Sequence, residues 1–311
     1  MRYLQRIIDQ VRRQTENEDV DDFVGIQNSE FIQYLNDAQF HLQAAIVQQH
    51  ARAFVQETII DAVSNQERYD LPSDCLLGNK VHNVEYSATG NDEDYYSLDE
   101  DTIKKRLSGV SGAPTIYIRL SGQLLISPQP ASGGKIRINY VQRARELDLR
   151  VAQVASAPTL SSSTSWTISL ADTFETDTSS LSEHDYVCVI DKEGNSIIKN
   201  IEITASTSSE LTCAAHTVST ADGESASDIL TDHYIVGGKD ATTHCDLPIS
   251  VERYLIAYCA WKILKRDSSV DSSEAMTELQ GLAQEIVSSY AMISDDIQYI
   301  PQLNSWDDWS V

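Results

Sequence analysis

Alternation of apolar and polar residues is clearest between Ala113 and Val141. Three runs lie there, namely Thr115–Leu120, Gln123–Ser127 and Lys135–Val141, and the first and the third show the period of two that is typical of a half-buried strand. Ser121-Gly122 separates the first two runs and predicts a tight hairpin. We therefore predict a three-stranded antiparallel meander. Because three short strands cannot bury an apolar face alone, we expect helices from elsewhere in the chain to cover it.

A helical spacing of apolar residues recurs at both ends of the chain, over residues 1–15, 28–55, 248–266 and 271–293. Stripes of this kind pack a subunit's own core or a neighbouring subunit. The second and third stretches carry the residues that we select for this packing role: Phe31, Leu35, Leu42, Val251, Leu255, Tyr258 and Trp261.

The middle of the chain differs in composition from both ends. Residues 156–165 are rich in Ser and Thr, and several short alternating runs follow them, with Lys192-Glu193-Gly194-Asn195 as a hairpin turn. The pattern predicts an inserted all-β module over 151–245, either a small barrel or a sandwich. Its many Ser, Thr and Asp residues indicate a solvent-facing addition to the core.

The fold class predicted from these patterns is α+β. We expect a helical bundle core with the small β meander (residues 1–150 and 246–293), the inserted β module (151–245) and an extended C-terminal tail (294–311). The tail has no periodicity, so it either packs back on its own subunit or docks on a neighbour. Its large side chains are Tyr299, Ile300, Leu303, Trp306 and Trp309.

The composition of the chain limits the kinds of partner that we expect it to bind. The formal net charge is -24, which disfavours a protein that binds nucleic acid by neutralising phosphates. No apolar run approaches the roughly 20 residues that cross a bilayer, and the first residues lack the pattern of a signal peptide, so we expect no membrane partner. The five cysteines include no C-x-x-C pair and indicate reduced, mostly buried thiols, although a Cys188–Cys213 disulfide stays open as an alternative.

Motifs of known chemistry are missing from the sequence. It has no phosphate-binding loop, no G-x-S-x-G and no H-E-x-x-H. Three short groups could in principle supply metal ligands, namely His184-Asp185, Asp232-His233 and His244-Cys245-Asp246, but their spacing matches no metal site, which favours solvated loop histidines. We therefore predict no enzyme, with no catalytic residue, no metal and no cofactor.

The order of several short motifs carries a family resemblance. Two N-terminal helical stretches lead to YDLPSDCL (Tyr69–Leu76), then to VEY (Val84–Tyr86), the hairpin and the strand ending at Tyr140. LPISVERYLIAYCAWKIL (Leu247–Leu264) and a last helix follow the β module. In this order the chain resembles the head-to-tail adaptor (connector) proteins of tailed bacteriophages, podophage-like ring proteins beneath the portal. The resemblance covers residues 1–150 and 246–293 and leaves out the β module.

The resemblance implies a structural role without catalysis. It implies a homo-oligomeric, twelve-fold ring that docks on the portal protein, extends the DNA channel and supports the tail nozzle protein and tail fibres. Genomic DNA would pass through without sequence-specific binding, and the protein would lie in the neck of the virion after assembly in the host cytoplasm. Tyr299, Ile300, Leu303, Trp306 and Trp309 would dock on the portal. The alternative is a virion structural protein whose β module binds a carbohydrate or a receptor.

Overall fold

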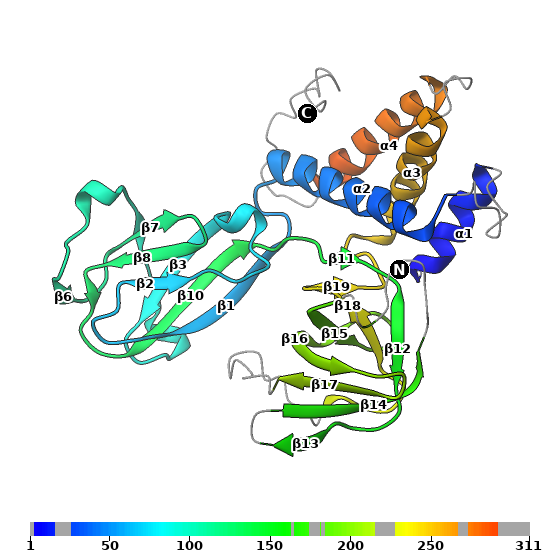
Figure 1. The fold of residues 1–311 in the computed structure, drawn as a ribbon. Helices are drawn as coiled ribbons and strands as arrows, with labels where there is room; N and C mark the ends of the chain where they lie inside the picture. Colours follow the sequence, from blue (N-terminus) through cyan, green and yellow to red (C-terminus); the bar gives the residue numbers. More distant parts are fainter. Residues whose placement is uncertain are drawn as a thin grey trace. The chain divides into compact units, whose positions relative to one another are not determined.

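The computed structural model describes residues 3–15, 26–162, 165–173, 181, 184–214, 228–266 and 273–291. It divides the chain into two compact units, of which unit 1 comprises residues 1–50 and 144–311, and unit 2 comprises residues 51–143 (Figure 1). Helices and strands occur in both halves of the sequence, so the predicted mixed α+β class is confirmed. The chain crosses between the units at 50/51 and 143/144, whereas the division expected from the sequence lay at 150 and 245.

Unit 2 is built from two four-stranded sheets and a short strand pair. The first sheet has the order β1-β10-β3-β4 and the second the order β2-β8-β7-β5, with β6 paired to β9. The strands are β1 (Val55–Ala62), β2 (Arg68–Asp70), β3 (Val81–Ser87), β4 (Tyr96–Ser97), β5 (Asp99–Glu100), β6 (Ser111–Gly112), β7 (Ile116–Leu120), β8 (Gln123–Ser127), β9 (Gln129–Pro130) and β10 (Gly134–Val141).

The meander predicted from the sequence is correct for two of its three strands. β7 and β8 form the expected antiparallel hairpin, with Gly122 in the turn at a φ of 72°. The third strand, β10, pairs instead with β1 and β3 in the other sheet. Pro128 and Pro130 lie between β8 and β10, and because proline has no N–H to donate, the chain leaves the ladder there.

The apolar face of this meander is covered by strands and not by helices as expected. One cluster of buried side chains takes Val84, Ile136 and Ile138 from the first sheet, and Leu124 and Ile126 from the second. All members of the cluster lie between residues 60 and 140. Two sheets with one apolar face each can bury those faces against each other, so unit 2 has a core of its own.

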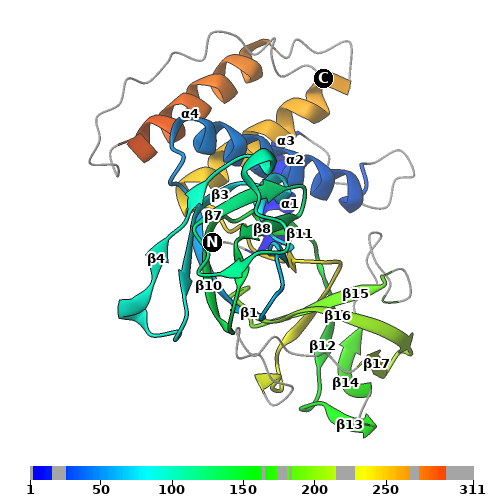
Figure 2. The same cartoon turned by 90° about the vertical axis from the view of Figure 1, so that its left-hand side faces the viewer.

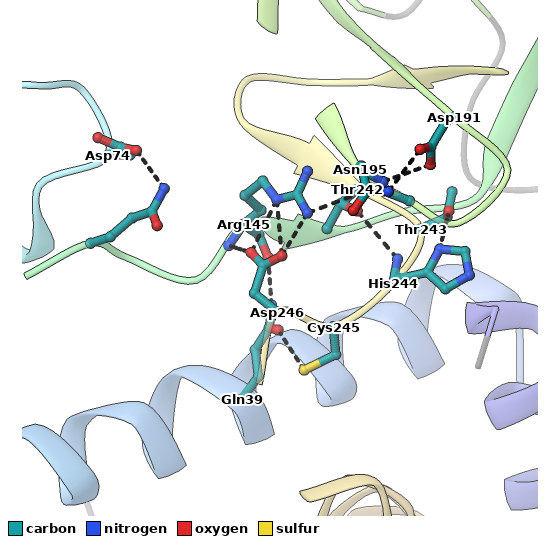
Figure 3. A network of polar contacts seen from close by, with 12 residues as sticks. Gln39, Asp74, Arg145, Asp191, Asn195, Thr242, Thr243, His244, Cys245 and Asp246 are labelled. Carbon is teal, nitrogen blue, oxygen red and sulfur yellow. Dashed lines mark hydrogen bonds and ion pairs between the residues drawn. The ribbon is translucent and has the colours of Figure 1, made fainter. Parts of the chain in front are cut away.

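A buried carboxylate holds the end of unit 2 together. Asp74 accepts hydrogen bonds from Tyr140 Oη at 2.9 Å and from Gln142 Nε2 at 2.8 Å, the second of which is drawn in Figure 3. Its backbone carbonyl also accepts from the Arg143 N–H at 2.7 Å. Charge-assisted bonds of this kind are stronger than neutral ones, so Asp74 fixes the last strand residues before the chain leaves unit 2.

Unit 1 contains a closed β-barrel. Its strand order β12-β18-β15-β16-β17-β14 closes through a further pairing of β14 with β12, and β13 is added outside on β14. The strands are β12 (Arg150–Val154), β13 (Thr159–Ser162), β14 (Ser165–Thr173), β15 (Tyr186–Ile190), β16 (Ser196–Ser206), β17 (Glu210–Ala214) and β18 (Tyr234–Gly237), and the short strands β11 (Glu146–Leu147) and β19 (Ala241–Thr242) pair in parallel beside them. Of the two alternatives for the β module, the structure has the barrel.

The described part of unit 1 also contains four α-helices: α1 (Leu4–Gln14), α2 (Asn28–Gln49), α3 (Glu252–Arg266) and α4 (Ser273–Ala291). α3 packs against each of the other three, and α2 also contacts α4 (Figure 2). Apolar residues at helical spacing explain these contacts, because Leu4, Ile7, Ile8 and Val11 of α1 are all buried. No helix in the described ranges is long and apolar enough to cross a membrane.

Candidate functional site: a polar junction in unit 1

Three amide side chains of α2 bind one extended backbone segment, residues 144–147. Asn36, Gln39 and Gln43 are spaced by three and four residues, which places them on one face of the helix. Gln39 and Gln43 are almost completely buried. The bonds are Asn36 Nδ2 to Leu147 O (3.0 Å), Leu147 N to Asn36 Oδ1 (2.8 Å), Gln39 Nε2 to Arg145 O (2.8 Å) and Ala144 N to Gln43 Oε1 (3.0 Å). The helix thus supplies the donors and acceptors that a neighbouring strand would otherwise supply.

Arg145 joins this segment to the chain that follows the barrel. Its guanidinium donates to both carboxylate oxygens of Asp246, from Nη2 to Oδ1 at 2.6 Å and from Nε to Oδ2 at 3.1 Å, and to Gly194 O at 3.1 Å (Figure 3). The Arg145 N–H donates to the same carboxylate at 2.9 Å. A bidentate pair fixes both the position and the orientation of its members. Residues more than a hundred positions apart in the sequence are therefore held at one point.

The turn between β15 and β16 fits against the segment that follows β19. Gly194 has a φ of 88°, and a Cβ at this position would overlap the ring of His244. Its carbonyl oxygen accepts from Thr242 Oγ1 at 3.2 Å, and Thr242 Oγ1 in turn accepts from the His244 N–H at 3.3 Å. Both the backbone conformation and the close approach require glycine here. Asp191 closes the same turn by accepting from Asn195 Nδ2 at 2.7 Å.

Arg150 lies between two aromatic rings at the start of β12. Its guanidinium carbon is 4.5 Å from the ring centre of Tyr3 and 3.7 Å from that of Tyr234, and Nη2 donates to Lys192 O at 2.9 Å. These contacts between the Arg150 guanidinium and two aromatic rings attach Tyr3, the residue before α1, to the barrel. The Leu4 N–H donates to Thr243 O at 3.0 Å and adds a backbone link to the same place.

Burial is the main cause of the pKa shifts of the groups in this junction. It raises the pKa of the Cys245 thiol to about 12, and the Sγ donates to Gln39 Oε1 at 3.4 Å. Burial also raises the pKa of Asp148 to about 7, against a smaller opposing effect of the Leu149 N–H. The pKa of His244 is lowered by burial and by the charge of Arg150. Cys245 is thus a protonated thiol at neutral pH, which is not the nucleophilic form.

The junction is a set of attachment points, and its polar groups bind each other and the backbone. In the ranges that the structure describes, no group of three or more His, Cys, Asp and Glu side chains is placed to hold a metal ion. His233 Nδ1 accepts from the Leu230 N–H at 3.1 Å, and His244 packs on Gly194. All five cysteines are free and buried, so the Cys188–Cys213 disulfide left open above is not formed.

The helix residues selected from the sequence lie mostly in the interior of unit 1. Phe31, Leu35 and Leu42 of α2 are buried, as are Val251 just before α3 and Leu255 and Tyr258 within it. Trp261 is half-buried, with the ammonium groups of Lys262 and Lys265 at 5.5 Å and 5.0 Å from its ring centre. Of this set, Trp261 alone keeps substantial exposed surface. Tyr299, Ile300, Leu303, Trp306 and Trp309 lie outside the described residues.

Our sequence-based selection missed the residues of the junction. Asn36, Gln39 and Gln43 interrupt an otherwise apolar stripe at regular spacing, and this signal could have marked a polar contact on the helix. Arg145 and Asp246 carry no comparable signal. Their pairing depends on how the chain returns after the barrel, which local patterns do not specify.

These observations define a mixed α+β protein in which a helical part and a closed barrel are joined through a buried polar junction. The model of the SU10 adaptor protein family matches residues 2–176, more than half of the chain, and the chain belongs to this family. It is therefore a phage adaptor protein and a component of the virion, which confirms the adaptor resemblance at this level. The match continues past residue 150 into the first barrel strands. No curated protein matches the chain.

Proposed function

We propose that this chain is a head-to-tail adaptor of a phage virion, a podophage-like ring protein that lies beneath the portal in the neck. Twelve copies form a ring that docks on the portal protein, extends the DNA channel and supports attachment of the tail nozzle protein and the tail fibres. The chain assembles in the host cytoplasm. The observation that carries the proposal is the match to the SU10 adaptor family over residues 2–176.

The charge of the chain supports a role beside moving DNA. A net charge of -24 offers few sites that would retain phosphates, and a ring with an acidic inner surface repels the DNA backbone. Genomic DNA then slides through the ring without sequence-specific binding. An adaptor that bound DNA tightly would slow both packaging and ejection.

The helices are the proposed core of the ring. In this proposal α1–α4 act as one bundle, and the exposed part of Trp261 is a candidate for contact with the neighbouring subunit, because aromatic residues at half-buried positions are common interface anchors. The side chains of Phe31, Leu35 and Leu255 are enclosed within unit 1 and serve to hold its core. Tyr299, Ile300, Leu303, Trp306 and Trp309 dock on the portal.

The proposed role is non-catalytic and needs no cofactor. The polar junction supports it, since Arg145 and Gln39 are engaged in fixing the backbone and the buried Cys245 thiol is protonated at neutral pH. A junction of this kind keeps a barrel attached to a helical part under mechanical load, because several bonds must break together before the parts separate.

Electron microscopy of the full-length chain mixed with the portal of the same phage tests the proposal. We expect twelve-fold rings stacked on portals. Replacing Trp306 and Trp309 by alanine should abolish stacking, whereas replacing the nearby Gln298 and Gln302 should leave it intact. Portals without added rings, at concentrations where the chain is folded, would contradict the proposal. Binding of the chain to glycans in place of portals would favour the alternative of a receptor-binding virion protein.

A further inference from the structure

Strand β1 forms one edge of the first sheet of unit 2 (Figure 1). It lies beside β10 over its whole length, with an unbroken register from Val55↔Val141 to Ala62↔Gly134. At eight residues it is much longer than the edge strands β2, β4 and β5, which have three, two and two. A long edge strand presents a row of backbone groups to any strand that can reach it.

The hydrogen-bond pattern identifies the backbone groups of β1 that face outward. The Gln142 N–H donates to Phe54 O at 2.9 Å, and bonded pairs alternate with non-bonded pairs in an antiparallel ladder. Every second residue after Phe54 therefore bonds to β10, and the residues between them point their N–H and C=O groups away from it. Within the described residues, these outward groups have no hydrogen-bond partner. They belong to Val55, Glu57, Ile59 and Asp61.

Two carboxylates stand on the outer face of this edge. Glu57 and Asp61 are four residues apart, so their side chains project from the same face of the sheet, with Ile59 between them. Both are well exposed, with 50% and 70% of the side chain accessible. β1 itself carries no Lys or Arg. Two copies of β1 would therefore bring like charges together, and the edge favours a strand that brings cations.

The outer face of the sheet keeps an excess of negative charge although its carboxylates have partners. Lys135 Nζ donates to Asp61 Oδ1 at 2.6 Å, and Arg137 Nε lies 3.5 Å from a Glu57 oxygen. Arg137 also pairs with two further carboxylates, so four carboxylates share two cations. Exposed pairs of this kind are weak, and a carboxylate can accept several hydrogen bonds. A cation on an incoming strand therefore finds acceptors at Glu57 and Asp61.

We propose that β1 binds an extended segment of a different protein, which joins the sheet as an antiparallel strand and carries Lys or Arg at two positions four residues apart. The cations then lie opposite Glu57 and Asp61, and the residue midway between them is apolar and lies opposite Ile59. Main-chain hydrogen bonds to the outward groups supply affinity, and the charge pairs select the register. A shift of two residues, the smallest that keeps side chains on their faces, places both cations opposite apolar side chains.

The sequence of this chain excludes the chain itself as the source of that segment. Its Lys and Arg residues stand four apart at two places, Arg2 with Arg6 and Lys262 with Arg266. Arg6 lies in α1, and Lys262 and Arg266 lie in α3, so neither place offers a strand. The residues outside the described ranges contain no Lys or Arg other than Arg2. For a member of an adaptor family, the segment comes from another component of the virion.

A synthetic peptide tests the binding chemistry on the full-length chain. The amidated peptide Lys-Thr-Val-Thr-Lys-Thr-Val, labelled with fluorescein at its N-terminus, places its lysines opposite Asp61 and Glu57 and its first valine opposite Ile59. Titration of the chain into this lysine peptide should give a saturable rise in fluorescence anisotropy. Binding should also slow hydrogen exchange over residues 54–62, because the outward N–H groups of β1 become bonded.

Two control peptides separate strand pairing from general attraction to an acidic chain. Lys-Thr-Val-Lys-Thr-Thr-Val has the same composition, but its lysines project from opposite faces of a strand. The second control keeps the original sequence and carries an N-methyl group on the first valine, which removes the N–H that pairs with Ile59 O. Each should bind at least about tenfold more weakly, because the first lacks a charge pair and the second lacks a central hydrogen bond.

Substitutions in β1 test the two carboxylates. Glu57→Gln combined with Asp61→Asn should weaken binding of the lysine peptide about tenfold, because both charge pairs are lost. The control variant combines Glu93→Gln with Asp99→Asn, which makes the same change of charge at exposed positions of unit 2 outside β1. It should bind the lysine peptide as tightly as the unmodified chain does.

Three outcomes would overturn the proposal: no saturable binding of the lysine peptide, equal binding of either control peptide, or equal binding by the variant in β1. The control peptides use the unmodified chain, so they decide even if that variant fails to fold. None of these measurements involves the portal or a ring. Their failure and the failure of the proposed function can therefore be told apart.

Discussion

The barrel of unit 1 and the first sheet of unit 2 differ in whether their outermost strands are paired. In the barrel, β14 pairs with β12 as well as with β17, so the sheet closes on itself. In unit 2 the sheet ends at β1, and four backbone positions are left facing outward. Closure removes the row of unpaired groups that makes a sheet edge reactive toward other strands. The barrel is therefore complete within one chain, whereas the sheet keeps the capacity to extend.

The two regions also differ in how they use charge. The outer face of the sheet carries Arg137 between Glu57, Glu85 and Asp92, stacked on Tyr95 at 3.8 Å. Surface pairs of this kind contribute little to stability individually. In the junction beside the barrel, Arg145 is mostly enclosed and binds Asp246 and a backbone carbonyl together. We infer that charge orders the exposed sheet face locally, whereas at the junction it joins distant segments.

Cavities in the two cores should produce the largest effects. Ile168 in the barrel and Ile138 in unit 2 are both fully buried, and Ile→Ala at such sites costs about 2–5 kcal/mol of unfolding free energy. Each substitution should lower protection only within its own core, because the two clusters share no residue. Hydrogen exchange resolved by peptide measures this. Equal loss of protection in both cores after either substitution would show that they unfold as one.

Gly194→Ala should be the next most damaging change. The added Cβ overlaps the His244 ring and also strains a backbone with a φ of 88°, for a combined cost of about 2–4 kcal/mol. Gly109→Ala in unit 2 is a matched control, because its φ of 72° is similar but nothing lies within 4 Å of the new Cβ. The control should cost only about 1–2 kcal/mol by chemical denaturation. Equal costs would mean that the His244 contact is unimportant.

The amide contacts of α2 should contribute less. Gln39→Leu removes the donor to Arg145 O and leaves a buried carbonyl without this bond, which costs about 1–3 kcal/mol. Gln33→Leu changes the same residue type at an exposed position of the same helix and should be nearly neutral. Urea denaturation followed by circular dichroism compares the two. A neutral Gln39→Leu would indicate that the 144–147 segment is held by its other contacts.

A further effect should be a pH dependence that arises from Asp148. Burial raises its pKa in the folded chain to about 7, whereas the unfolded value is near 3.9. Between these values the folded state holds a proton that the unfolded state has released, so stability falls as pH rises from about 4 to about 7 and is then constant. Asp148→Asn should remove this contribution and be more stable than the unmodified chain at pH 8. Parallel stability curves for both chains across this window would refute the assignment.

The local pattern of apolar and polar residues was enough to predict many of the helices and strands. Period-two runs predicted β7 and β10, the Ser121-Gly122 turn predicted β8 as the partner of β7, and helical spacing predicted α1, α2, α3 and α4. The periodic patterns arise because the faces of strands and helices must separate apolar from polar residues whatever they pack against. The Ser/Thr-rich stretch over residues 156–165 and the alternating runs after it also indicated a barrel or sandwich in the middle of the chain. The order of the short motifs was enough to indicate the adaptor family.

Tertiary structure decided which elements meet. Lys135–Val141 has the pattern of a third meander strand, yet it pairs with β1 and β3, because the pattern specifies one buried face and leaves the hydrogen-bonding neighbours open. For the same reason the sequence did not indicate that the meander is covered by a second sheet. The bonds of Arg145 with Asp246 and of Gln39 with residue 145 join segments about a hundred positions apart. Contacts over such separations depend on the path of the whole chain, and only the folded structure contains that path.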